Sequence, residues 1–149
     1  LRQNPEDNIE IDIAGQGKLL EDVQNLEKED ERLHYLGKLS KDEIKADLHK
    51  YKYLILPSKE EPFGIVLLEA LAAGVPSIVS NALGPDEIID NKKTGIKFSL
   101  TDGYKGFETA MKKSQQLSEC EYKKMVQNCL LESQKYSEEA IFKKWKMVL

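Results

Sequence analysis

The chain has few of the residues that mark several common classes of protein. It has two cysteines in 149 residues, too few for the disulfide framework of a small secreted domain, so we expect Cys120 and Cys129 to be reduced thiols. We also expect both cysteines, together with Trp145, to lie in the core. The two histidines have no cysteine or aspartate at ligand spacing, so we expect no metal site. The longest apolar run, 62–76, is interrupted by Glu69 and is shorter than the roughly 18 to 20 residues that span a bilayer.

An excess of positive charge is also missing. Lys and Arg number 22 and Asp and Glu number 26, for a formal net charge of -4. A nucleic-acid-binding protein needs a basic face that displaces counterions, so we expect no nucleic-acid partner. The lysine pairs at 112–113, 123–124 and 143–144 favour a solvated surface, with peripheral membrane association as the alternative. Residues 1–7 are not followed by an apolar segment, so we expect no signal peptide and a cytoplasmic protein, with the inner face of the membrane as the alternative.

Strand-like and helix-like segments alternate along most of the chain. We predict strands at 9–13, 33–36, 53–56, 77–79 and 96–98, and helices at 18–29, 41–49 and 62–73, followed by an all-helical region after Asp102. Ser40 with Glu43, and Ser118 with Glu121, have the spacing of capping boxes, and Ser137 can cap a last helix that carries Ile141, Trp145 and Val148. The pattern predicts one α/β domain over residues 1–149, a parallel sheet with helices on both faces.

One long loop is predicted at 80–94. It is rich in Asn, Gly, Pro and Asp. Glu87 within it either holds the loop against a cleft or caps the helical turn that follows.

The most informative stretch is 57–76, which begins where a predicted strand ends. Open α/β sheets bind ligands at this carboxyl edge. Pro62 suits the first position of a helix, Gly74 suits the left-handed residue after its end, and Pro76 prevents continuation. The sequence therefore predicts a helix from 62 to 73 next to a ligand site.

Glu69 is the one charged residue in this otherwise apolar helix. A helix that is apolar all round is buried, and a carboxylate in it costs several kcal/mol to desolvate unless it has partners. Two interpretations stay open at this point. Glu69 either fills a gap in the packing or pairs with a structural lysine, or it faces a ligand and accepts hydrogen bonds from hydroxyls.

The start of the same helix offers backbone N–H groups at Phe63, Gly64 and Ile65, where the lack of a side chain at Gly64 allows an anion to approach. Glu61 stands just before this turn. Glu61 and Glu69 lie eight positions apart, roughly 12 Å along a helix at about 1.5 Å per residue. This spacing fits a ligand with hydroxyls at both ends and an anionic middle, as in a nucleotide sugar.

These motifs resemble those of the retaining GT-B-fold glycosyltransferases of the group 1 (family 4) type. Glu61-Pro62-Phe63-Gly64 followed by Glu69, Gly74 and Pro76 is similar to their signature of two glutamates separated by seven residues. Further segments resemble the family's motifs in the same order: Ile13–Gly17, Leu36–Leu39, Leu56–Ser58, Gly84–Ile89 and Gly95. The resemblance extends from Ile9 to Trp145.

The resemblance implies a role for each matched residue. Glu61 would be the catalytic-site residue and contact the hydroxyls of the transferred sugar, and Glu69 would accept hydrogen bonds from the ribose. The remaining positions would bind the donor largely through the backbone. Phe63, Gly64 and Ile65 would contact the sugar and the diphosphate. Gly37, Lys38 and Leu39 would lie beside the base, and Gly15 and Gly17 would line the same side of the site as these three residues. No metal would be required, because cationic side chains and the helix N-terminus neutralise the diphosphate.

The family has two α/β domains, and this chain resembles only the second, donor-binding one. It is expected to lack the first strand of that domain and the cations of the loop after it, and to need a preceding N-terminal domain. We therefore expect the chain alone to be inactive and prone to self-association through an open strand edge.

The resemblance implies a hexosyltransferase of polysaccharide biosynthesis. A hexose would move from a UDP- or GDP-sugar to a hydroxyl of a glycan or lipid-linked acceptor with retention. The alternative is a non-catalytic nucleotide-sugar-binding or regulatory α/β module.

Overall fold

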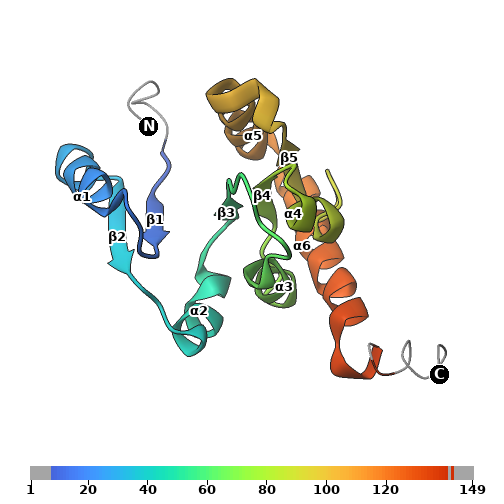
Figure 1. Cartoon of the computed structure of the whole chain (residues 1–149). Coiled ribbons are helices and arrows are strands. Elements are labelled where there is room, and N and C mark those ends of the chain that lie inside the picture. The colour runs from blue at the N-terminus through green and yellow to red at the C-terminus, as the bar shows by residue number, and fades with distance from the viewer. Residues whose placement is uncertain (1–7, 141, 143–149) are drawn as a thin grey trace. The chain divides into compact units, whose positions relative to one another are not determined.

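The computed structural model describes residues 8–140 and 142 (Figure 1). The chain divides into two compact units, Leu1–Ile44 and Lys45–Leu149, and each is described by itself. Ile141, Trp145 and Val148, which the sequence places on a last helix, lie outside the described residues.

The first unit contains a two-stranded parallel sheet. Strand β1 (Ile11–Ala14) leads through helix α1 (Leu20–Glu29) to strand β2 (Leu33–Gly37). Ile11 is paired with Leu33, and Ile13 with Tyr35. Every described residue of this unit keeps appreciable solvent exposure, so its apolar residues form only a thin core.

The second unit contains a three-stranded parallel sheet in the order β3-β4-β5. The strands are β3 (Leu54–Leu56), β4 (Ser77–Ser80) and β5 (Gly95–Phe98). All four residues of the central strand β4 are buried. The boundary between the two units falls within helix α2 (Lys41–Asp47). The helical elements of the second unit after α2 are η1 (Leu48–Lys50), α3 (Ile65–Ala72), α4 (Leu83–Ile88), η2 (Leu100–Asp102), α5 (Gly103–Gln116), α6 (Glu119–Ser133) and η3 (Gln134–Tyr136).

Helices cover both faces of this sheet because successive side chains of a strand point to opposite faces. Val79 packs into a buried cluster with Leu67 and Leu71 of α3, Ile88 of α4, Cys129 of α6, and Ile89, which directly follows α4. Its neighbour Ile78 packs on the other face with Ile96, Phe98 and Ala110, beneath α5. The predicted fold class, a Rossmann-like parallel α/β fold, is therefore confirmed.

Several helix ends are where the sequence places them. The two capping boxes form: Ser40 exchanges hydrogen bonds with Glu43, and Ser118 does so with Glu121. At the end of α3, Gly74 is left-handed with φ +70. The amide of Gly74 donates to the carbonyl of Leu71, and that of Val75 donates to Ala70. This pair of bonds is a Schellman motif.

The predicted loop at 80–94 is wrong in one part, because residues 83–88 form helix α4. Gly84 and Pro85 gave the segment the composition of a turn. Pro85 is nevertheless tolerated because it lies in the first turn of α4, where backbone N–H groups have no intrahelical partner.

The cysteines differ from each other, so their joint placement in the core was half wrong. Cys129 is completely buried and Cys120 is exposed, and both are free thiols. The thiol of Cys129 donates to the carbonyl of Thr94 at 3.4 Å. Burial raises the pKa of Cys129 to about 12.

We expect only Cys120 to react with a thiol reagent in the native chain. Because the thiolate is the reactive form, a pKa of about 12 keeps Cys129 protonated and unreactive at pH 8. Titration with Ellman's reagent should modify one thiol per chain rapidly under native conditions and two in denaturant. Rapid modification of both thiols in the folded chain would contradict the packing of α6.

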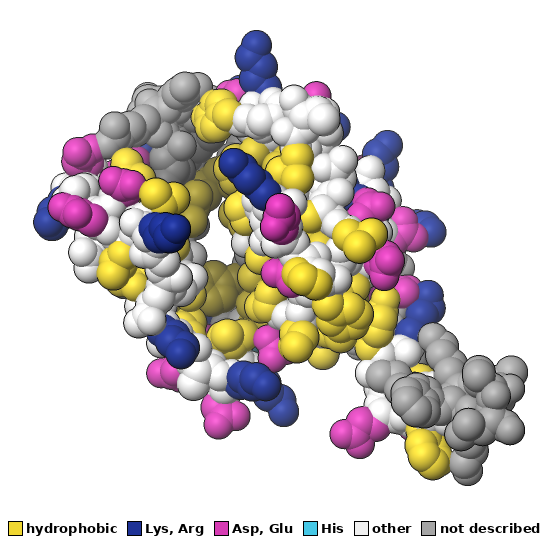
Figure 2. All heavy atoms as spheres, in the orientation of Figure 1, with side chains coloured by type: hydrophobic (Ala, Val, Ile, Leu, Met, Phe, Trp, Pro, Cys, Tyr) yellow, Lys and Arg dark blue, Asp and Glu magenta, His cyan; other side chains and the backbone are white. Residues whose placement is uncertain are grey.

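The surface mixes charges of both signs. On the face that Figure 2 shows, basic and acidic side chains are interspersed. Among the described residues, no helix has the length and apolar character needed to cross a membrane.

Candidate functional site

The loop that joins β3 to α3 lies at the carboxyl end of β3 and contains Glu61. One oxygen of the Glu61 carboxylate, Oε1, accepts hydrogen bonds from the backbone amides of Gly64 at 3.0 Å and Phe63 at 3.4 Å. Gly64 is the N-cap of α3 and is left-handed, with φ +81. A left-handed residue is costly for most side chains, so glycine allows the turn that places this carboxylate at the start of the helix.

This turn corrects the predicted start of the helix. The prediction placed Pro62 at the first helical position, but α3 begins at Ile65. Gly64 is left-handed, so the chain is not helical at this residue, and the Glu61 carboxylate accepts hydrogen bonds from the amides of the same turn. Because residues 61–64 are not helical, the helical rise does not give the separation of Glu61 and Glu69.

The amides of Phe63 and Gly64 are also not open, contrary to the sequence-based expectation. The Glu61 carboxylate occupies them. An anion is stabilised at this place by the N–H groups and by the positive end of the helix dipole. The turn therefore already holds one carboxylate where an anionic ligand would bind, and a ligand must displace it to reach these amides.

Glu69 lies in the middle of α3 and is partly buried. Its neighbours Leu67, Ala70 and Leu71 are fully buried. Within residues 8–140 and 142, its carboxylate has no hydrogen bond and no ion pair. The structure therefore offers no support for the interpretation in which Glu69 pairs with a structural lysine.

Two contacts from the next βα segment hold the Glu61 loop, and sequence reasoning missed both. The buried hydroxyl of Ser80, at the end of β4, donates to the carbonyl of Ser58. The amide of Gly84 in α4 donates to the carbonyl of Glu61 at 3.0 Å. A Cβ at Gly84 would lie 2.6 Å from the Phe63 backbone. The sequence signal for this close approach was the glycine itself.

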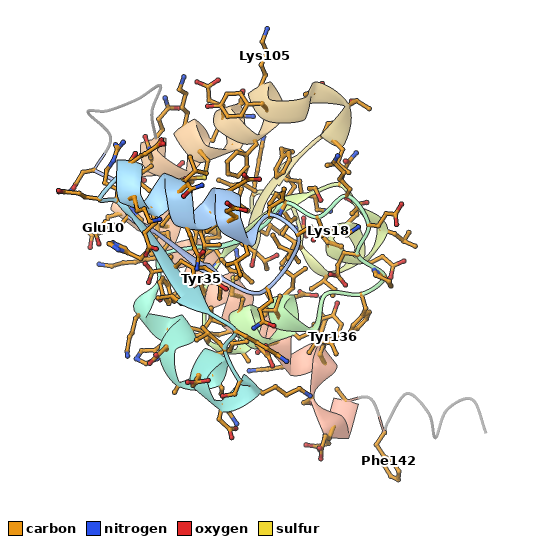
Figure 3. All side chains as sticks on the ribbon, turned by 60° about the vertical axis from the view of Figure 1, so that its left-hand side comes forward. Glu10, Lys18, Tyr35, Lys105, Tyr136 and Phe142 are labelled. Atoms are coloured by element: carbon orange, nitrogen blue, oxygen red, sulfur yellow. The ribbon has the colours of Figure 1, made fainter. Side chains whose placement is uncertain are left out.

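The residues predicted to line the base belong to the first unit, where two of them meet. The amide of Gly15 donates to the carbonyl of Gly37 at 2.8 Å. The hydroxyl of Tyr35, labelled in Figure 3, donates to the carbonyl of Gly15 at 2.8 Å. Gly17 and Lys38 are exposed and Leu39 is partly buried. The loops after β1 and β2 are therefore joined at the carboxyl ends of their strands.

Two further features of the second unit are Glu87 and a pocket beside α5. Glu87 is exposed, and in the described part of the chain its side chain makes neither of the contacts considered for it. A pocket of about 370 Å³ lies between β5 and α5 and is lined partly by Lys97 and Lys105. The lining also contains Lys113 and Asp102, and Lys97 is paired with Asp86.

Comparison with known families gives one assignment for most of the chain. Residues 1–129 match the family model described as "Glycosyl transferases group 1". Glycogen synthase of Mycobacterium tuberculosis is 43% identical over 68 residues, which are 46% of this chain and 16% of that protein. N-acetyl-alpha-D-glucosaminyl L-malate synthase of Bacillus anthracis is 42% identical over 84 residues, 56% of this chain and 21% of that protein. The matches thus span a small fraction of these relatives.

Solved structures show the same fold. The pneumococcal O-GlcNAc transferase GtfA, in complex with UDP and GlcNAc, has a TM-score of 0.80 at 20% identity, covering 99% of this chain and 30% of that one. Sucrose-phosphate synthase from Thermosynechococcus elongatus has a TM-score of 0.77 at 20% identity, covering 92% of this chain and 37% of that one. The predicted resemblance to part of a GT-B protein is confirmed.

Proposed function

The chain belongs to the glycosyl transferases group 1 family, and we propose on this basis that it is the donor-binding half of a retaining GT-B glycosyltransferase. The donor is a UDP- or GDP-hexose, and the acceptor is a hydroxyl of a glycan or a lipid-linked saccharide. The chain spans 16% and 21% of the two curated relatives compared above. The acceptor-binding surface is therefore proposed to come from a further domain, as is the closure that brings donor and acceptor together.

The observation that carries this proposal is the turn before α3. It presents two amides at the positive end of a helix and already stabilises a carboxylate there. A diphosphate carries more negative charge than a carboxylate and has more acceptor oxygens, so it suits the same amides. We propose that the diphosphate displaces the Glu61 side chain.

The displaced carboxylate of Glu61 then reaches the hydroxyls of the sugar attached to the diphosphate. Glu69 accepts hydrogen bonds from the ribose, since its carboxylate has no other partner among the described residues. A role of Gly15 and Gly37–Leu39 in binding the base stays a prediction from the family resemblance. The reaction as proposed uses no metal, because the amides and the helix dipole stabilise the leaving diphosphate.

The proposal is tested by calorimetric titration of the chain with UDP, GDP, ADP and inorganic diphosphate. We expect one nucleoside diphosphate to bind in preference to the others, and more tightly than inorganic diphosphate, because the ribose adds hydrogen bonds. Equal binding of all four would indicate a general anion site and contradict a donor site. Donor binding without any sugar transfer by the complete protein would favour the alternative, a non-catalytic nucleotide-sugar-binding module.

We expect Glu61→Ala to separate the sugar from the nucleotide. Removing the carboxylate frees the amides of Phe63 and Gly64, so the affinity for the bare nucleoside diphosphate should stay the same or rise. The affinity for the nucleotide sugar should fall by about 10-fold or more, since a hydrogen bond to a charged group is lost. Calorimetric titration with the nucleoside diphosphate and with the nucleotide sugar gives the ratio of the two affinities. An equal loss for the two ligands would show that Glu61 does not contact the sugar.

A further inference from the structure

We propose that Gly84 is a positioning residue for the donor site, acting through the backbone of residues 61–63. This inference rests on the proposed function and adds a residue to it. Gly84 lies in α4, on a different βα unit from the loop that carries Glu61. It contributes no side chain to any ligand, and its effect is to fix where the loop backbone lies.

The backbones of Gly84 and of the Glu61 loop lie very close together. An added Cβ at Gly84 would lie 2.6 Å from both the amide nitrogen and the Cα of Phe63, and 2.7 Å from the carbonyl oxygen of Glu61. All three atoms belong to the backbone, so no side-chain rotation relieves the contact. Any side chain at position 84 must push the loop and α4 apart.

A hydrogen bond also joins these two backbones. The amide of Gly84 donates to the carbonyl of Glu61 at 3.0 Å. Separation of the two backbones therefore breaks this bond, and it moves the residue whose carboxylate binds the amides of Phe63 and Gly64. The carboxylate and both amides shift together, and these are the groups that the proposed function assigns to the sugar and the diphosphate.

Helix α4 is itself fixed to the sheet, so the loop is the part that must move. The amide of Asn81 donates to the carbonyl of Phe98, and the side chain of Asn81 accepts from the amide of Leu100. Lys97 on β5 donates to the backbone carbonyl and the carboxylate of Asp86. The end of β5 thus anchors both ends of the segment that carries Gly84.

The experiment compares Gly84→Ala with Gly106→Ala in the full chain. Gly106 is a less tightly packed glycine in α5, where a Cβ would lie 2.9 Å from the carbonyl oxygen of Ser99 and 3.0 Å from the Cβ of Asp102. Both variants are expected to lower the midpoint of thermal unfolding. Only Gly84→Ala should weaken binding of the preferred nucleoside diphosphate, by about 10-fold, when binding is measured well below that midpoint. Equal affinities of the two variants would overturn the inference.

A second readout does not need a ligand. Hydrogen–deuterium exchange of the peptide that covers residues 58–64 should be faster in Gly84→Ala and unchanged in Gly106→Ala. If the wild-type chain binds no nucleoside diphosphate, the proposed function fails. In that case hydrogen–deuterium exchange still tests whether Gly84 positions the loop. An unchanged exchange rate of residues 58–64 in Gly84→Ala would refute this positioning.

A double-mutant comparison separates positioning from a general loss of stability. In the wild-type background, Glu61→Ala is expected to change the ratio of nucleotide-sugar to nucleotide affinity about 10-fold. In the Gly84→Ala background, Glu61→Ala should leave this ratio of affinities nearly unchanged, because the Glu61 carboxylate is already misplaced. A ratio that changes equally in both backgrounds would show that the two residues act independently.

Discussion

Gly95→Ala is expected to destabilise the second unit by more than about 3 kcal/mol, beyond the usual cost of overpacking a core. Gly95 is paired with Ser77 across strands β4 and β5. A Cβ at this position would lie 2.1 Å from the carbonyl oxygen of Ser77 and 2.8 Å from a methyl group of Ile89. The strands must separate to admit it. Such a loss is a large share of a total stability of about 5 to 15 kcal/mol.

Urea denaturation followed by circular dichroism measures this effect. The matched control is Ile96→Val on the same strand, which removes one methylene from a buried side chain and should cost only about 0.5 to 1.5 kcal/mol. If Gly95→Ala were no more destabilising than Ile96→Val, the register of β4 and β5 described above would be wrong.

Glu69→Ala is expected to weaken binding of the preferred nucleoside diphosphate by about 1.5 to 3 kcal/mol, or roughly 10- to 150-fold. The reason is the environment of Glu69. It is a partly buried carboxylate on an apolar helix, and it has no hydrogen bond or ion pair within the described residues. A ribose would supply the hydroxyl donors that it lacks.

The variants that accompany Glu69→Ala make the result specific. Glu69→Gln keeps the shape and loses the charge, so it should give an intermediate loss of affinity. Glu87→Ala removes an exposed carboxylate of α4 and should leave affinity within about 2-fold. A measurement of stability is also informative, because removal of a partly buried charge without a partner should not destabilise the free chain. Unchanged affinity in Glu69→Ala would remove this residue from the site.

Much of the fold could be predicted because its signals are local. The capping boxes at Ser40 and Ser118 need only a hydroxyl and a glutamate three residues apart. The end of α3 needs only Gly74 before Pro76. The parallel α/β arrangement follows from apolar segments that alternate with amphipathic ones. Such signals depend on residues that are close in the sequence, so periodicity and spacing reveal them.

The internal arrangement of the site could not be predicted in the same way. The start of α3 depends on where the side chain of Glu61 points, which no spacing rule specifies. The contact of Gly84 with residues 61–63 joins positions that are more than twenty residues apart in the sequence. It depends on the absence of a side chain at Gly84, which allows the two backbones to approach each other. The pairing of Gly15 with Gly37 likewise became visible only when β1 and β2 were placed side by side.

The central claim is that the backbone amides before α3 bind the diphosphate of a nucleotide sugar. The most direct test is a titration of the ¹⁵N-labelled chain with the preferred nucleoside diphosphate, followed by two-dimensional NMR. The account predicts that the largest shifts of amide resonances fall on Phe63, Gly64 and Ile65. The amides around Tyr53 and Tyr122, whose rings pack together, should stay unchanged. Saturable binding that leaves Phe63, Gly64 and Ile65 unshifted would contradict the account.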